Sequence, residues 1–234
     1  MFDGRFWAGY FRRIFAKQIS HFCAAVEARF LPTFDSLEAE AEAAKDAEWE
    51  RLGQIIDPEY ADEATLAEQA HEVGIDYYMS MERVRQTLIN LSVAALYHLF
   101  EQQLLLFHRR QVLHPKEEND KDLINTKEFK TRLSVAGLQI ETLKSWAKIE
   151  ELRVVANTIK HAEGTSADKL RQLRPDLFAH PQTRGTTGFD SLSMSRVRVY
   201  MPLAGEDIFL TVADLKAYCT TLLEFWEEFG AAIQ

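Results

Sequence analysis

Leu88-Ile-Asn-Leu-Ser-Val-Ala-Ala-Leu-Tyr-His-Leu-Phe-Glu-Gln-Gln-Leu-Leu-Leu106 is a strongly apolar stretch of the chain. On a helix its large side chains fall on nearly every side, which is typical of a helix buried at the centre of a domain. We therefore predict a long central helix from about Gly74 to Val112. Apolar residues recur at helical spacing elsewhere too, so the sequence predicts an all-α fold with five or more principal helices.

Four other segments show the spacing of amphipathic helices, and a fifth is rich in helix-forming Ala and Glu. In the first helix, Phe6, Tyr10 and Ile14 begin an apolar face that runs to Phe30, before Pro32 ends the helix. The Ala/Glu-rich segment has few large apolar anchors, which indicates a solvated helix. The predicted helices are 6–31, 38–55, 127–146, 147–162 and 212–233.

A small β-hairpin is predicted just before the C-terminal helix. Arg196-Val-Arg-Val-Tyr200 and Asp207-Ile-Phe-Leu-Thr211 alternate apolar and polar residues on either side of Pro202 and Gly205. The hairpin would belong to an excursion over about 179–211. No internal repeat is visible, so residues 1–234 are interpreted as one helical domain.

Composition excludes some classes of protein. The 234 residues are 47% hydrophobic, which is enough for one sizeable core. No uninterrupted run of eighteen apolar residues occurs, so no membrane span is predicted. Cys23 and Cys219, the only cysteines, both lie in apolar patterns, which predicts two buried thiols in a reducing cytoplasm. The formal charge of −9 is uneven, since residues 153–198 hold eight Lys or Arg against four Asp or Glu. A locally basic surface can therefore exist on an acidic protein.

The most informative motif for function is Glu151-Leu-Arg-Val-Val-Ala-Asn-Thr-Ile-Lys-His-Ala-Glu-Gly164. As a helix, it places Arg153, Asn157, Lys160 and His161 within about 100° of arc, because each residue advances roughly 100°. The adjoining side is apolar and can pack. Two cations, an amide and an imidazole on one strip suit a phosphodiester.

These residues and the long aliphatic helix upstream resemble the HEPN superfamily, whose members are all-α and include many metal-independent ribonucleases. The family signature is Arg, then four to six residues, then His; here seven residues separate Arg153 from His161. The resemblance implies a HEPN-like bundle, a homodimer and an endoribonuclease of a bacterial toxin or antiviral defence system. It also implies an RNA substrate, no cofactor or metal, and an antitoxin or defence partner protein.

In such an enzyme His161 would move the proton of a ribose 2′-hydroxyl or of the leaving oxygen. Arg153 and Lys160 would hold the phosphate, and Asn157 would orient the imidazole or the phosphate. Further phosphate contacts could come from the neighbouring basic residues, which are Arg171, Arg174, Arg196 and Arg198.

Two other interpretations of the strip stay open. A catalytically inactive HEPN module could bind RNA, a nucleotide or a partner protein with the same residues. Alternatively, Arg153 and Lys160 are ordinary solvated helix residues, and His161 caps the helix end, where a cation interacts favourably with the helix dipole. His98 and Glu101, one turn apart in the apolar helix, are interpreted as a buried hydrogen-bonded pair.

Overall fold

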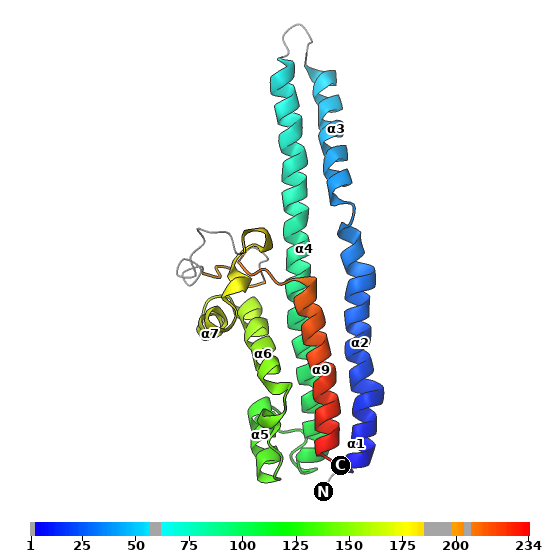
Figure 1. Ribbon diagram of the computed structural model, residues 1–234, viewed down its shortest axis with the longest axis vertical. Helices are drawn as coiled ribbons and strands as arrows, with labels where there is room; N and C mark the ends of the chain where they lie inside the picture. Colours follow the sequence, from blue (N-terminus) through cyan, green and yellow to red (C-terminus); the bar gives the residue numbers. More distant parts are fainter. Residues whose placement is uncertain (1–2, 57–61, 185–197, 204–206) are drawn as a thin grey trace.

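The structure, a computed structural model, describes residues 3–56, 62–184, 198–203 and 207–234. Its described residues are helical apart from turns and extended segments without strand pairing, so the all-α prediction is confirmed. The central helix α4 (Glu63–Phe107) runs the length of the molecule, between α6 (Trp146–His161) and α2 (Ala16–Ala25) with α9 (Val212–Ala232) beside it (Figure 1). The start of α1 (Gly4–Tyr10) and the end of α9 meet at one end of the molecule, where Gly4 approaches the Ile233 carbonyl (Figure 1).

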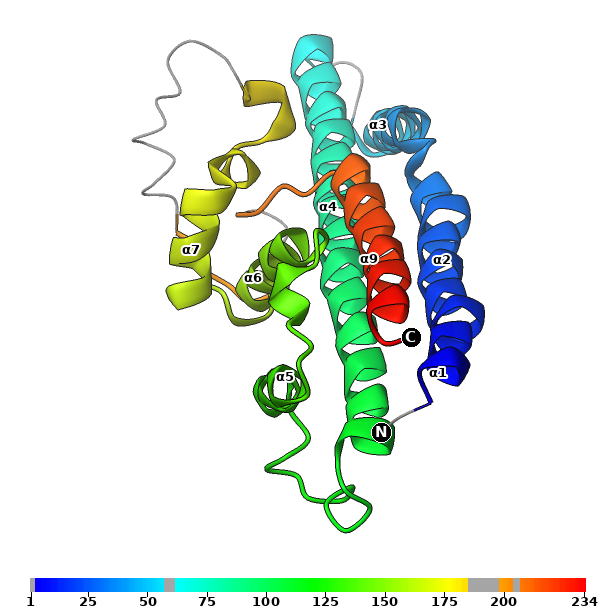
Figure 2. The ribbon, with the colours of Figure 1, turned by 60° about the horizontal axis from the view of Figure 1, so that its bottom comes forward.

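Shorter elements complete the chain. α1 (Gly4–Tyr10) precedes α2, and α3 (Leu37–Ile55) packs along the first half of α4. α5 (Thr126–Val135) and α7 (Thr165–Leu173) lie on the α6 side of the molecule, as both views show (Figure 2). The 3-10 and π-helical turns are Phe11–Phe15, Val26–Phe30, Leu31–Phe34, His108–Val112, Ile140–Thr142, Pro175–Phe178 and Pro181–Thr183.

The core is built from aromatic rings where α1, α2, α4 and α9 meet. Trp226 is at its centre, with ring centroids 4.7 Å from Phe11 and 4.8 Å from Phe15. Gln103 is buried there, and both the nitrogen and the oxygen of its amide have hydrogen-bond partners, as buried polar groups usually do. Its Nε2 donates to the Phe15 carbonyl at 3.1 Å, and its Oε1 accepts from Trp226 Nε1 at 2.9 Å.

Several predicted helix bounds need correction. α4 starts eleven residues before Gly74, which is buried in the helix interior. A Cβ at Gly74 would lie 3.0 Å from the Ala41 carbonyl oxygen and 3.1 Å from Lys45 Cβ, so glycine favours the close approach of α3. The predicted 127–146 helix stops at Val135, because Gly137 adopts a positive φ of 84° and the Leu138 amide bonds back to the Leu133 carbonyl.

The predicted face of the first helix is buried only in its middle. Phe15, Ile19 and Val26 are buried as predicted, whereas Phe6 and Phe30 are more than half exposed. Trp7 and Phe11 are buried instead near the start of the helix. Two π-helical turns interrupt the helix, at Phe11–Phe15 and Val26–Phe30. A π turn is wider than an α turn, so residues four apart stay in line and the buried stripe shifts away from the α-helical spacing.

The predicted hairpin is wrong for the described residues, because segments 198–203 and 207–211 form no strand. Several of their backbone groups bond to helices, and the two segments are linked by a bond from the Tyr200 amide to the Asp207 carboxylate. The Ile208 carbonyl accepts from Asn90 Nδ2 at 2.8 Å, and the Leu203 amide donates to the Ile159 carbonyl at 2.8 Å. The alternating apolar residues Val199, Ile208 and Leu210 are buried against helices rather than on one face of a sheet.

The two cysteines are also not free thiols. Cys23 of α2 and Cys219 of α9 form a disulfide with a Cα–Cα distance of 6.7 Å. Their separation of 196 residues in sequence hid the adjacency of these helices. Disulfides are typical of oxidising compartments, so this bond does not favour the predicted cytoplasmic location. That location stays a prediction. No helix among the described residues is long and apolar enough to cross a membrane.

His108 predicts a pH dependence of folding. The ring is fully buried, and Nε2 lies 2.8 Å from the Leu123 carbonyl, to which it can donate. Nδ1 has no hydrogen-bond partner in the described part of the chain. Burial, aided by the charge of Arg132, lowers the pKa of His108 below its usual 6.5. The unfolded chain therefore binds a proton that the folded chain resists, so stability is present above pH 6.5 and is lost as pH falls below it.

We expect urea unfolding to give a lower free energy at pH 5.5 than at pH 7.5, with a slope from His108 of at most about 1.4 kcal/mol per pH unit. His108→Gln, which keeps a donor for the Leu123 carbonyl, should lose this contribution to the slope. An unchanged slope in the variant would show that protonation of His108 does not limit stability.

Candidate functional site

The motif helix α6 buries the side that the sequence assigned to packing. Leu152, Val155, Ala156 and Ile159 are all at most 3% exposed. Val154 and Thr158 are buried too, and Thr158 Oγ1 donates to the Val154 carbonyl at 2.8 Å. Arg153, Asn157, Lys160 and His161 form the strip that is left to meet solvent; the first two are half-buried and the last two exposed.

Three residues of this strip lack a partner within the described part of the chain. Asn157, Lys160 and His161 make no side-chain hydrogen bond or ion pair there. Lys160 and His161 occupy the last turn of α6, where the backbone carbonyls carry partial negative charge. The helix ends immediately afterwards, because Ala162 takes a positive φ of 60° and the chain turns away. These polar groups are therefore available to a ligand from outside the chain.

Arg153 is in a different situation. Its Nη2 lies 2.9 Å from Glu150 Oε2 and its Nε 3.1 Å from the same oxygen. The hydrogen bond to Glu150 raises the pKa of Arg153 above its usual value, and the nearby Tyr97 and Glu101 act in the same direction. Glu150 precedes Arg153 by about one turn, so the guanidinium is held toward the N-terminal end of α6, away from His161.

α4 contributes polar groups next to Arg153. His98 Nδ1 lies 3.2 Å from Glu101 Oε2, so the predicted hydrogen-bonded pair is present, but it is half-buried rather than buried, since both side chains are about one-third exposed. Tyr97 beside them is 5% exposed, and burial, reinforced by Glu101, raises its pKa. The motif of α6 and the His98–Glu101 pair of α4 were separate features of the sequence, and the structure brings them to one place.

A hollow of about 200 Å³ opens beside Arg153, between α4, α5 and α6. Lys127 and Lys130 of α5 line it, and Lys130 Nζ lies 5.5 Å from the centre of the Trp146 ring. Sequence analysis missed these two lysines. Their only sequence signal is the spacing of three residues, which puts both on one side of a helix and is common on solvated surfaces. The hollow places two more cations next to the strip.

The additional arginines predicted to contact phosphate differ in their surroundings. Arg171 pairs with Glu163 at 2.6 Å and with Asp168 at 3.0 Å, and its side chain is only 9% exposed. Arg174 pairs with Glu151, Asp176 and Asp214. The hydrogen bonds to Asp176 and Asp214 hold its pKa well above the usual value. Both guanidinium groups are thus occupied by carboxylates, and that of Arg174 joins Glu151 of α6 to Asp214 of α9. Arg198 is exposed, and Arg196 lies outside the described residues.

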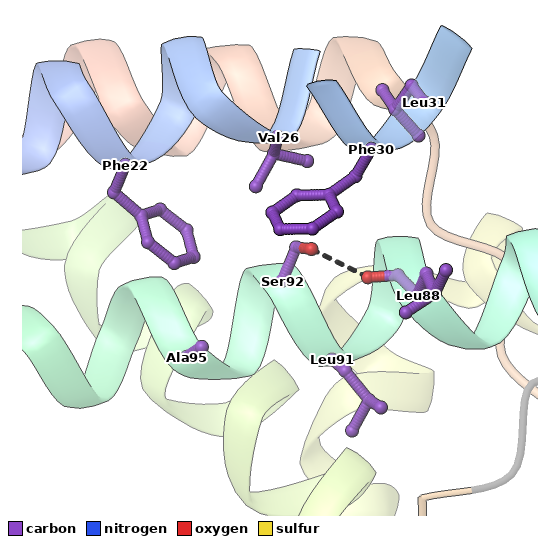
Figure 3. Close-up of a pocket in the computed structure, with 8 residues that line it drawn as sticks. All are labelled: Phe22, Val26, Phe30, Leu31, Leu88, Leu91, Ser92 and Ala95. Carbon is purple, nitrogen blue, oxygen red and sulfur yellow. Dashed lines mark hydrogen bonds between the residues drawn. The ribbon is translucent and has the colours of Figure 1, made fainter. Parts of the chain in front are cut away.

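A second hollow, of about 210 Å³, lies between α2 and α4 and is almost wholly apolar (Figure 3). Phe22, Val26 and Phe30 face Leu88 and Ala95 across it, and Ser92 Oγ donates to the Leu88 carbonyl at 2.7 Å. It offers no titratable group for catalysis. Exposed apolar surface of this kind is compatible with self-association, which stays a prediction that light scattering can check.

Comparisons with protein-family models, with curated proteins and with solved structures find no match to this chain.

Proposed function

We propose that the α6 strip binds the phosphate backbone of RNA and that the protein is a metal-independent endoribonuclease. The observation that supports this most is that Asn157, Lys160 and His161 have no side-chain partner among the described residues, on a helix whose other side is fully packed. Polar side chains on a fixed helix can contact a ligand without first breaking internal bonds.

The proposed chemistry needs two proton transfers. A ribose 2′-oxygen attacks the phosphorus as it loses its proton, and the 5′-oxygen of the next nucleotide leaves as it gains one. This forms a 2′,3′-cyclic phosphate and a 5′-hydroxyl. An imidazole can take or give such protons near neutral pH, and this is the role of His161. Lys160 attracts the phosphate, and Asn157 orients it or the imidazole.

One observation favours a second candidate, an RNA- or nucleotide-binding module without cleavage. Arg153 and His161 are eight residues apart, so their backbones are separated by about 12 Å along the helix. Because Glu150 also holds Arg153 on the far side, the two residues do not converge within one chain. The resemblance to HEPN proteins suggests how an active site could still form. In a homodimer, the α6 strip of the second chain would face the strip of the first across one cleft. The homodimer, an antitoxin or defence partner and a cytoplasmic location are parts of the same proposal.

RNA binding tests the strip itself. We expect Lys160→Ala to weaken binding of a single-stranded RNA oligonucleotide in fluorescence anisotropy and to lower the slope of log affinity against log salt by about 1, because one phosphate contact is lost. Lys169→Ala, which removes an equally exposed lysine from α7, is the matched control and should bind like wild type. Equal behaviour of the two variants would mean that diffuse charge, not the strip, attracts RNA.

A further inference from the structure

We define the helical arm as α3 together with residues 62–86, which are Asp62 and the first part of α4. It carries an open groove that the proposed ribonuclease chemistry does not use. Figure 1 shows that the arm extends far beyond α6 and α9. Gly74 allows the two helices of the arm to pack closely, and Tyr77 ties them together by donating from its hydroxyl to Glu40 Oε2 at 2.7 Å. The groove is therefore part of a fixed surface.

The floor of this groove is apolar and exposed. A hollow of about 260 Å³ is lined by Ala41 and Gly74 at its base and by the side chains of Ile75 and Met79. These two side chains, one turn apart on α4, are 48% and 50% exposed. Tyr78 and Met79 also line an adjoining hollow of about 440 Å³, which continues the groove along α4 to Gln86. From residue 75 to residue 86 the floor spans about 17 Å, the length of a helix of three turns.

The arm carries an excess of acidic residues. Residues 37–55 and 62–86 contain twelve Asp or Glu against four Lys or Arg, which gives this part of the chain a formal charge of −8. Three of the four basic residues are ion-paired within their own helix, Lys45 with Glu42, Arg51 with Glu48 and Arg85 with Glu82. Glu38, Glu42 and Lys45 line the groove itself, and Glu82 and Arg83 line its continuation. Acidic residues thus outnumber basic ones three to one on the arm.

The sign of this charge selects the occupant. RNA phosphates are repelled, and the same is true of the arm of a second copy. A cationic helix with one apolar face would cover Ile75 and Met79 while its Lys or Arg side chains lie near Glu38, Glu42 and Glu82. We propose that the groove of the arm docks a basic amphipathic helix of a partner protein, which is the helix-in-groove mode of recognition.

The experiment uses the full chain and an 18-residue amphipathic peptide of Leu and Lys, labelled for fluorescence anisotropy. A peptide of the same composition, rearranged so that it has no apolar face, is the first control. We expect the amphipathic peptide to bind at least about tenfold more tightly than the rearranged one at physiological salt, since only the former offers an apolar face to the groove. Equal affinity for the two peptides would overturn the proposal.

Variants locate the binding surface. Ile75→Ser with Met79→Ser removes apolar contact without changing charge, and Glu38→Gln with Glu42→Gln removes charge without changing shape. Each pair should weaken the amphipathic peptide by about tenfold or more. Glu224→Gln with Glu227→Gln, on exposed positions of α9, is the matched charge control and should bind as wild type does.

Other outcomes each contradict the proposal. Weakening by the α9 pair equal to that of the arm pair would show only long-range attraction between opposite charges. Loss of a dimer in light scattering when Ile75 and Met79 are replaced would assign the groove to a second copy. Displacement of the peptide by RNA, with the same loss in the arm variants, would assign it to nucleic acid. Circular dichroism of every variant checks that the helices remain formed.

Discussion

Trp226→Ala is expected to lower the free energy of unfolding by about 3–5 kcal/mol, the range measured for large aromatic side chains removed from a core. The indole is 2% exposed and packs against Phe11, Phe15 and Phe100. Surrounding helices can collapse into the cavity only partly, because the disulfide joins α2 to α9.

The substitution also removes a hydrogen-bond donor. Trp226 Nε1 donates to Gln103 Oε1, and Gln103 is 3% exposed, so its oxygen would be left buried without this partner. Such an orphaned acceptor costs about 1–3 kcal/mol, which puts the expected loss in the upper part of the range.

Trp49→Ala on α3 is the matched control, since Trp49 is 39% exposed and lies on the arm. Urea unfolding should show a change of at most about 0.5 kcal/mol for this variant, as is usual for surface positions. A similar loss for both tryptophans, or a loss under 1 kcal/mol at Trp226, would contradict the aromatic core described here.

His161→Ala is expected to reduce metal-free RNA cleavage by about 10²–10⁴-fold, the usual contribution of a general acid–base group. RNA affinity should change little, because a neutral imidazole adds little attraction to phosphate. The melting temperature should also be unchanged, since His161 is exposed and has no partner among the described residues.

His71→Ala, an exposed histidine on the arm, is the control and should cleave like wild type. If His161→Ala instead melts several degrees lower and cleaves normally, the residue has a structural role only. If His161→Ala loses affinity in proportion to Lys160→Ala and no chemical step is found, the strip binds without catalysing.

The sequence predicted the packing of α6 well, because the period of its apolar residues directly determines which side is buried. It could not predict where Arg153 points. The guanidinium bonds to Glu150 one turn earlier, and helical spacing alone does not determine which neighbour an arginine pairs with. Nor could it show that Lys127 and Lys130 approach Arg153, because that contact depends on how α5 packs against α4 and α6.

The predicted hairpin finds no support in the described residues, for a related physical reason. Alternation of apolar and polar residues reports which side chains are buried, and a strand is only one way to bury them. Here Asn90 Nδ2 donates to the Ile208 carbonyl and Gln86 Nε2 to the Leu210 carbonyl, so two helix side chains replace a partner strand. A buried Asn and a Gln one turn apart in an apolar helix were the available signal.

Two of the ion pairs of Arg174 were hidden by distance along the chain. Arg174 contacts Glu151 and Asp214, which are 23 and 40 residues away. A basic residue that joins helices cannot be distinguished in sequence from one that is free to contact phosphate, whereas its carboxylate partners in the structure identify it at once.

Incubation of the purified protein with a single-stranded RNA oligonucleotide in EDTA tests the central claim most directly. The account predicts cleavage that leaves a 2′,3′-cyclic phosphate and a 5′-hydroxyl, that is blocked where the attacking 2′-hydroxyl is replaced by hydrogen, and that is lost in His161→Ala. RNA that stays intact until a divalent ion is added, or cleavage that survives His161→Ala, would contradict it.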